Sequence, residues 1–147
     1  MIISLGLDHH AVQLKDVLTE HFEARGFEVL HRGAVSDKPV DYPDVAKKVA
    51  KDIRTMQANF GVLICSTGIG MSIAANKFQG IRAALVHTLE DAKLSREHND
   101  ANVMCVGASY VTPEQLCKLT DIFFDTEFSG GRHERRLSKI VEFEFSE

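Results

Sequence analysis

Short apolar runs alternate with longer amphipathic stretches from one end of the chain to the other. Five of these runs have the length and composition of buried strands, at residues 2–7, 27–30, 60–64, 83–86 and 103–106. Each run is followed by a stretch with helical spacing of apolar residues. The pattern therefore predicts an α/β fold, a single doubly wound (Rossmann-like) domain over residues 1–147, with a five-stranded parallel sheet and helices on both faces.

The amphipathic stretches predict helices at residues 11–25, 44–56, around 72–77, 89–97, 113–124 and 133–144. Gly26 is a suitable C-cap for the first, and Thr112 followed by Pro113 is a typical helix start. The third apolar run is predicted to be the central strand. Because ligands of such sheets bind beyond the carboxyl ends of the strands, we expect the chemistry in loops such as those that begin at Asp8 and Cys65.

Composition narrows the classes of function. The 147 residues carry a net charge of −4, so the chain lacks the broad basic field that binding to nucleic acid or to an anionic membrane requires. No segment approaches the ~20 apolar residues of a membrane span. The apolar start of the chain lacks the basic region of a secretory signal, and the three cysteines follow no zinc or redox spacing. These features favour a reducing, cytoplasmic setting.

The strongest chemical signal is the loop after the third apolar run, which reads Ile-Cys-Ser-Thr-Gly-Ile-Gly-Met-Ser from residue 64 to 72. Backbone N–H groups at such a strand-to-helix turn can hold a phosphate or a developing enolate. The same field favours a thiolate at Cys65, a candidate base or nucleophile, although a small buried residue at a strand end is an equally simple interpretation. No third glycine follows Gly68 and Gly70 at the spacing of a dinucleotide-binding loop.

Asp8, His9 and His10 directly follow the first predicted strand, at the same edge of the sheet as Cys65. One carboxylate and two imidazoles can bind a metal, bond sugar hydroxyl groups or hold a phosphate. We expect no metal, because adjacent histidines on an extended segment point apart and no further ligand stands at a fixed spacing. Asp8 is the better candidate for orienting a hydroxyl group, and it can also act as the N-cap of the first helix.

Two more polar clusters are candidates for chemistry. His98 and Asn99 end a predicted helix in a dense polar run. A histidine there can exchange a proton at neutral pH, as sugar ring opening requires, or simply respond to the helix dipole. Arg132 and Arg136 follow two glycines and are four residues apart, so both guanidinium groups would share one helix face. This pair predicts a phosphate clamp in preference to a solvated basic turn.

Together, these motifs resemble the ribose-5-phosphate isomerase type B family, which also includes allose-6-phosphate and galactose-6-phosphate isomerases. The similarity runs almost from end to end and is carried by residues 8–9, 64–77, 81–84, 98–103 and 130–136. The cysteine followed by the glycine loop and by Ala74, Ala75, Asn76 and Lys77 is the most specific part. That cysteine is typical of the branch that uses a thiol where other members use a glutamate.

The resemblance implies an aldose–ketose isomerase that needs no metal and no cofactor and works through a cis-enediol. It implies that Cys65 moves the proton between C1 and C2, and that His98, helped by Thr67, opens the furanose ring. The other implied roles are orientation of hydroxyl groups by Asp8 and Asn99, phosphate binding by His9, Arg132 and Arg136, and binding of the enediolate oxygen by the backbone of Ser66, Gly68, Ile69 and Gly70. A homodimer or homotetramer with shared active sites is implied as well, so a monomer should be inactive.

Three positions depart from the family pattern. Ala11 stands in a loop that usually has a glycine, Ser66 stands where glycine is frequent, and Ser109 stands where an arginine is common. Losing that arginine removes a charge-assisted contact typically worth about 1.5–3 kcal/mol. The motifs therefore specify the type of reaction more closely than the identity of the sugar substrate. Ribose 5-phosphate is the expected substrate. The alternatives are another four- to six-carbon aldose phosphate and a non-catalytic sugar-phosphate sensor.

Overall fold

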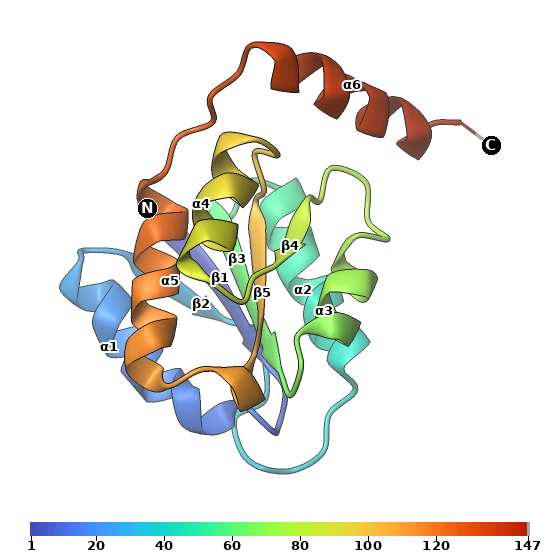
Figure 1. The fold of residues 1–147 in the computed structure, drawn as a ribbon. Helices are drawn as coiled ribbons and strands as arrows, with labels where there is room; N and C mark the ends of the chain where they lie inside the picture. The colour runs from blue at the N-terminus through green and yellow to red at the C-terminus, as the bar shows by residue number, and fades with distance from the viewer. Residues whose placement is uncertain (147) are drawn as a thin grey trace.

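The computed structural model describes residues 1–146, in which five strands form one parallel sheet (Figure 1). The strands are β1 (Ile2–Leu7), β2 (Glu28–His31), β3 (Phe60–Cys65), β4 (Ala83–Leu85) and β5 (Val103–Gly107). Their order across the sheet is β2-β1-β3-β5-β4. The third strand is therefore central, as its uniformly apolar sequence predicted.

Helices cover both faces of this sheet, which confirms the predicted α/β fold. They are α1 (Lys15–Ala24), α2 (Tyr42–Arg54), α3 (Ile69–Ala75), α4 (Leu89–Glu97), α5 (Pro113–Asp125) and α6 (Arg132–Glu144), with short 3-10 helices η1 (Val12–Leu14) and η2 (Ala108–Tyr110). Helices α1, α4 and α5 pack on one face, and α2 and α3 pack on the other. Within residues 1–146, no helix has both the length and the apolar composition required to cross a lipid bilayer.

Alternation along the central strand builds the two cores. In β3, Val62 and Ile64 belong to the core under α1 and α5, while Leu63 and Cys65 belong to the core under α2 and α3. Each fully buried aliphatic side chain stabilises the fold by about 1.5–3 kcal/mol. Because both faces are covered, this strand has to be apolar at every position. Its last residue, Cys65, lies on the α2 and α3 face at the carboxyl edge of the sheet.

The first predicted helix is divided in two, because η1 precedes α1. The N-cap residues of these two helices are Ala11 and Leu14, and neither has a side-chain cap. The prediction that Asp8 caps the first helix is therefore wrong. Its carboxylate accepts the backbone N–H of His10 (2.9 Å) instead, which closes a tight turn directly after β1.

Other element ends differ from prediction by a few residues. Helix α2 begins at Tyr42 instead of residue 44, since Pro43 fits the first turn, where its missing N–H leaves no helical bond unmade. Helix α3 begins at Ile69, ahead of the predicted segment 72–77. The predicted start of α5 is confirmed, because the Thr112 hydroxyl accepts the backbone N–H of Gln115 (3.1 Å) in a capping box.

Helix α6 stands apart from the sheet, beyond the amino ends of the strands (Figure 1). None of its residues 132–144 is buried, and Ile140 and Phe143 expose 45% and 71% of their surface. The segment that leads into it is fixed to the end of α4, because the N–H of Ser129 donates to the carbonyl of Glu97 (3.0 Å). The start of α6 therefore lies next to the end of α4.

The buried carboxylate of Asp52 ties α2 to β1 and, through an ion pair, to Arg32 directly after β2. The Asp52 side chain is 5% exposed and accepts hydrogen bonds from the Ser4 hydroxyl (2.7 Å) and from Arg32 Nε (2.7 Å). Ser4 itself is fully buried in β1. Removing the carboxylate would leave a buried hydroxyl and a guanidinium group without their shared acceptor.

We expect Asp52→Ala to lower the free energy of unfolding by about 3 kcal/mol, the lower end of the range for breaking a buried ion pair, because Arg32 is partly exposed. The matched control is Lys47→Ala, an exposed position on the same helix, which should change stability by less than about 0.5 kcal/mol. Urea unfolding measures both. A loss in Asp52→Ala no larger than in the control would contradict the structural role of this pair.

Candidate active site

Two predicted clusters meet at the carboxyl edge of the sheet. Strands β1 and β3 are neighbours with Leu7 opposite Ile64, so Asp8 and Cys65 are the next residues along their chains. The N–H of Asp8 donates to the carbonyl of Ile64 (2.9 Å) and extends the ladder by one residue. Asp8 and Cys65 are 5% and 6% exposed. The structure thus places the carboxylate segment beside the loop that begins at the thiol.

The Cys65 sulfur is held by the loop that follows it. Its Sγ accepts the backbone N–H of Gly68 at 3.1 Å, a contact that stabilises negative charge on the sulfur. Gly68 has φ +78°, and a Cβ there would lie 2.7 Å from the Leu85 side chain and 2.9 Å from the Val106 carbonyl carbon. The loop therefore needs glycine at this position to bring its N–H to the sulfur.

A second thiol, Cys105, lies in the same core but differs from Cys65 in its surroundings. It is fully buried in β5, and burial, with a smaller contribution from Cys65, raises the pKa of the Cys105 thiol. Cys105 therefore stays protonated and acts as a small core residue. Of the two strand thiols, Cys65 is therefore the one at the sheet edge.

Some of the loop N–H groups are used within the loop itself. The N–H of Ile69 donates to the Thr67 hydroxyl (3.3 Å), so it is engaged like that of Gly68. The first helical bond of α3 comes from the N–H of Ser72 (3.1 Å). The N–H groups of Gly70 and Met71 precede it and are left without a helical partner. Met71 was not predicted as a site residue. Its position in the first turn of α3, where backbone N–H groups lack helical partners, is the sequence signal that could have identified it.

The rim of the loop is formed by side chains from other elements. Tyr42 at the start of α2 packs on Gly70 so closely that a Cβ there would lie 2.5 Å from the Tyr42 ring. On the other side, the N–H of Ser109 donates to the carbonyl of Ser66 (3.1 Å). Ser109 is exposed. The position at which the family commonly has an arginine therefore lies at this rim.

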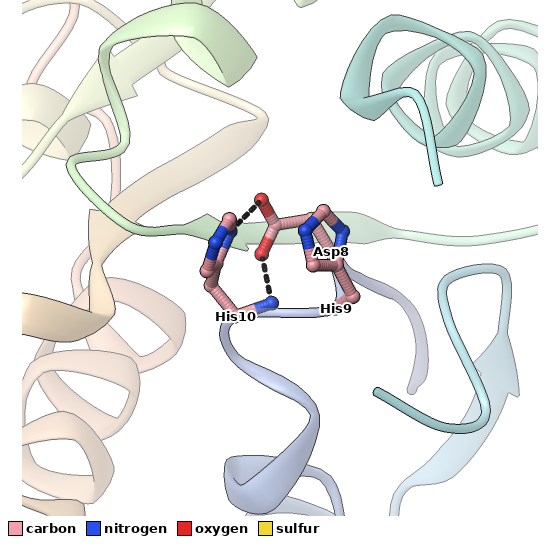
Figure 2. A group of neighbouring side chains, drawn as sticks. All are labelled: Asp8, His9 and His10. Carbon is pink, nitrogen blue, oxygen red and sulfur yellow. Dashed lines mark hydrogen bonds and ion pairs between the residues drawn. The ribbon is translucent and has the colours of Figure 1, made fainter. Parts of the chain in front are cut away.

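The rings of His9 and His10 lie against each other, next to the Asp8 carboxylate (Figure 2). Their centroids are 4.1 Å apart, and Nδ1 of His10 is 3.5 Å from Oδ2 of Asp8. The expectation that these adjacent histidines point apart is wrong. The turn closed by the N–H of His10 on Asp8 curls the segment, so the chain is not extended here.

A hydrogen bond fixes which nitrogen of His9 can donate. Its Nδ1 accepts the backbone N–H of Val40 at 3.2 Å. In the neutral ring, the proton must then be on Nε2, which becomes a donor. His9 is half-buried, whereas His10 is exposed. Val40 was not predicted as part of the site, and nothing in its sequence environment marks this long-range contact.

The remaining predicted residues gather at the opposite edge of the sheet. His98 is the C-cap of α4, which runs back from the carboxyl edge to the amino edge. Its ring stacks on His133 in α6, with centroids 4.4 Å apart and an interplanar angle of 16°. Burial, and then the positive charges of His98, Arg132 and Arg136, lower the pKa of His133. His133 was not predicted as a site residue, although it directly follows Arg132.

The dense polar run after His98 is mostly structural. Asp100 accepts a hydrogen bond from Arg96 (2.8 Å), whose guanidinium group is buried against aromatic rings. Asn102 accepts the backbone N–H of Arg82 (2.8 Å) and thereby ties the starts of β4 and β5 together. Asn99 is exposed and His98 is half-buried. These two residues are therefore the part of the run that can face a ligand.

Cys65 and His98 do not lie close together within one chain. Cys65 ends β3, whereas His98 lies just before β5 begins, and strands of this length are about 17–20 Å long. Figure 1 shows the ends of β1 and β3 at one side of the molecule and the end of α4 with α6 at the other. Each chain therefore holds two separate groups of predicted site residues, called half-sites below: the thiol with its loop and Asp8 at one edge, and the His98 group with the arginines at the other.

Known proteins share this arrangement of elements. A sequence profile described as Ribose/Galactose Isomerase matches residues 3–140. Ribose-5-phosphate isomerase B of Escherichia coli is 40% identical over 142 residues, which cover 97% of this chain and 95% of that protein. Probable ribose-5-phosphate isomerase B of Mycoplasma pneumoniae is 42% identical over 146 residues, which cover 97% of this chain and 94% of that protein.

Solved structures agree with the sequence relatives. Ribose-5-phosphate isomerase B of Clostridium thermocellum has a TM-score of 0.96 and 41% identity, covering 99% of this chain and 98% of that one. The Mycoplasma genitalium enzyme with bound ribulose-5-phosphate has a TM-score of 0.94 and 38% identity, covering 99% and 97%. The chain therefore belongs to the ribose/galactose isomerase family, as its motifs predicted, and it is a sugar-phosphate isomerase.

Proposed function

We propose that this enzyme interconverts ribose 5-phosphate and ribulose 5-phosphate through a cis-enediol, with Cys65 as the base and without a metal or cofactor. The observation that carries the proposal is the position of the Cys65 sulfur. It lies at the carboxyl edge, accepts the N–H of Gly68 at 3.1 Å, and is followed by unpaired N–H groups at the start of α3. A thiolate and an oxyanion site side by side are what proton removal next to a carbonyl requires.

In the proposed reaction, the Cys65 thiolate takes the proton from C2 of the open-chain aldose, and negative charge collects on O1. Backbone N–H groups of the loop, with those of Gly70 and Met71 free to bond, stabilise this oxyanion. The thiol then returns the proton to C1, while O2 loses its proton and O1 gains one. Asp8, next to Cys65 across the strand pair, orients the sugar hydroxyl groups.

The other steps need both edges of the sheet. At the carboxyl edge, His9 donates its Nε2–H to the phosphate. At the amino edge, His98 opens the furanose ring together with Thr67 of the other half-site, and Asn99 orients hydroxyl groups. Arg132 and Arg136 complete the phosphate site as charge-assisted donors.

Because the half-sites lie at opposite edges, we propose that a second copy of the chain completes each active site. In a two-fold dimer, the contact that brings the partner subunit's His98 to Cys65 also works in reverse, so two sites form at once. A cavity of about 310 Å³ lies between α6 and the start of β4, lined in part by Ile81 and Leu137. With the exposed Ile140 of α6, it offers an apolar surface to a partner. A homodimer is sufficient, and a homotetramer would contain two such pairs.

We also propose a cytoplasmic setting. All three cysteines of the chain, Cys65, Cys105 and Cys117, are free thiols. A reaction that depends on a reduced thiol is best supported where disulfides do not form.

The substrate is tested by measuring turnover of aldose phosphates with four, five and six carbons. We expect kcat/KM to be highest for ribose 5-phosphate, by about tenfold or more over a sugar that differs by one carbon. The exposed Ser109 at the rim favours a second candidate, isomerisation of a different aldose phosphate, because an arginine there would fill space and bind phosphate. A higher kcat/KM for another sugar would support that candidate, and binding without turnover of any sugar would indicate a sensor.

A further inference from the structure

We propose that Asp8, His9 and His10 bind a divalent transition-metal ion of the zinc class, and that the bound ion inhibits the enzyme. The reaction itself uses no metal. The proposed site is a regulatory or inhibitory one, built from two imidazoles and a carboxylate that the turn after β1 brings together. Imidazole nitrogen with carboxylate oxygen is a donor set that suits zinc, copper and nickel.

The distances fit such an ion. One oxygen of Asp8 and one ring nitrogen each of His9 and His10 all lie within 4.8 Å of one another. Nδ1 of His10 is 3.5 Å from Oδ2 of Asp8, close to the separation of about 3.4 Å between two ligands of a tetrahedral zinc ion with bonds of about 2.0–2.2 Å. Figure 2 shows both rings beside the carboxylate, and rotation of the His9 ring would bring the third donor to the ion.

The carboxylate is already oriented for this role. Its Oδ1 accepts the backbone N–H of His10 (2.9 Å), which turns Oδ2 toward the His10 ring. Asp8 is buried, but the His10 side chain is 59% exposed. An ion can therefore enter from solvent on the His10 side and meet a fixed carboxylate.

His9 can bind the ion only if it gives up a hydrogen bond that it makes in the ion-free protein. Its Nδ1 accepts the N–H of Val40 (3.2 Å), so the neutral ring carries its proton on Nε2. Binding of the ion through Nε2 requires that proton to move to Nδ1, and the contact with Val40 must then open. Loss of this contact is a spectroscopic signature that a nonspecific surface ion would not produce.

The ion would inhibit the isomerase because it would occupy residues that also bind the substrate. This step rests on the proposed function. Asp8 and His9 are proposed to contact the sugar and its phosphate, so an ion held by the same atoms excludes the substrate. His10 has no role in the proposed reaction. It can therefore be replaced to remove the ion site without removing a group that the reaction needs.

The test is a calorimetric titration with Zn²⁺ of the wild-type protein and of Cys65→Ala, in which the neighbouring thiol cannot serve as a ligand. We expect one ion per chain in both proteins, and adding His10→Val to either should weaken binding by at least about tenfold. His21→Asn is the matched control, because it removes an imidazole that is bound to Asp121 (2.7 Å), outside both groups of proposed site residues, and should leave the affinity unchanged. The Val40 amide signal in NMR should shift on addition of Zn²⁺ only where His10 is present.

Unchanged affinity in His10→Val would overturn the proposal, and so would loss of binding in Cys65→Ala alone, which would place the ion on the thiol. In isomerase assays, His10→Val should keep its activity and resist Zn²⁺ at concentrations that inhibit the wild-type enzyme. Zinc binding that depends on His10 in a protein without isomerase activity would support the ion site and refute the proposed function. An active isomerase with His10-independent binding would refute the ion site alone.

Discussion

Cys65→Ala is expected to lower kcat by about 10²–10⁴-fold, the range that a positioned general base contributes. Affinity for the sugar phosphate should change little, because the phosphate is proposed to bind to His9, Arg132 and Arg136, none of which touches the sulfur. The measurement is exchange of the C2 proton of ribose 5-phosphate with deuterated solvent, followed by NMR, together with the binding affinity of the variant.

Cys105→Ala is the control for this prediction, because it removes a second thiol from the same core without removing the proposed base. We expect that variant to exchange the C2 proton at a rate close to the wild-type rate for each folded chain. If Cys65→Ala still exchanged the C2 proton at the wild-type rate, Cys65 would not be the base, and the sulfur would have only the packing role that a buried strand end allows.

Mixing two inactive variants is expected to restore activity. Cys65→Ala lacks the base at one edge, and His98→Ala lacks the ring-opening group at the other. In a hybrid dimer, one of the two sites receives Cys65 from one chain and His98 from the other. Random pairing of equal amounts should therefore restore roughly a quarter of the wild-type activity. The assay is turnover after the two variants are unfolded together and refolded.

The control for mixing is Cys65→Ala combined with a double variant that carries both Cys65→Ala and His98→Ala, in which no hybrid has an intact site. It should stay inactive. If mass spectrometry showed that hybrids had formed and the first mixture was still inactive, Cys65 and His98 would have to act within one chain. Such a result would contradict the half-sites proposed here, because about 17–20 Å separates the two edges of the sheet in a single chain.

Local sequence signals predicted the elements well where the physical cause is local. The start of α5 at Thr112 and Pro113 depends on a capping box and on a proline in the first turn, both of which are written in neighbouring residues. The central position of β3 follows from burial on two faces, which requires an uninterrupted apolar strand. The start of α1 was less predictable, because η1 has the same amphipathic pattern as the helix that follows it.

The site was predictable in part. Parallel strands end at one edge, so Asp8 and Cys65 could be placed together from the sequence alone. The close packing of the His9 and His10 rings could not be predicted from the sequence. It depends on a turn closed by Asp8 and on a contact with Val40, about thirty residues away. The separation of His98 from Cys65 follows from the path of α4, which returns to the amino edge. The stacking of His98 on His133 depends on the position of α6, which its own amphipathic pattern does not specify.

Proton transfer at C2 of a phosphorylated aldose is tested most directly with the wild-type protein and ribose 5-phosphate in deuterated water, followed by NMR. We expect signals of ribulose 5-phosphate to appear with deuterium at C1, because a thiol at the sheet edge can exchange its proton with solvent before returning it. A spectrum in which the C2 proton stays in place and no ketose forms would contradict this chemistry.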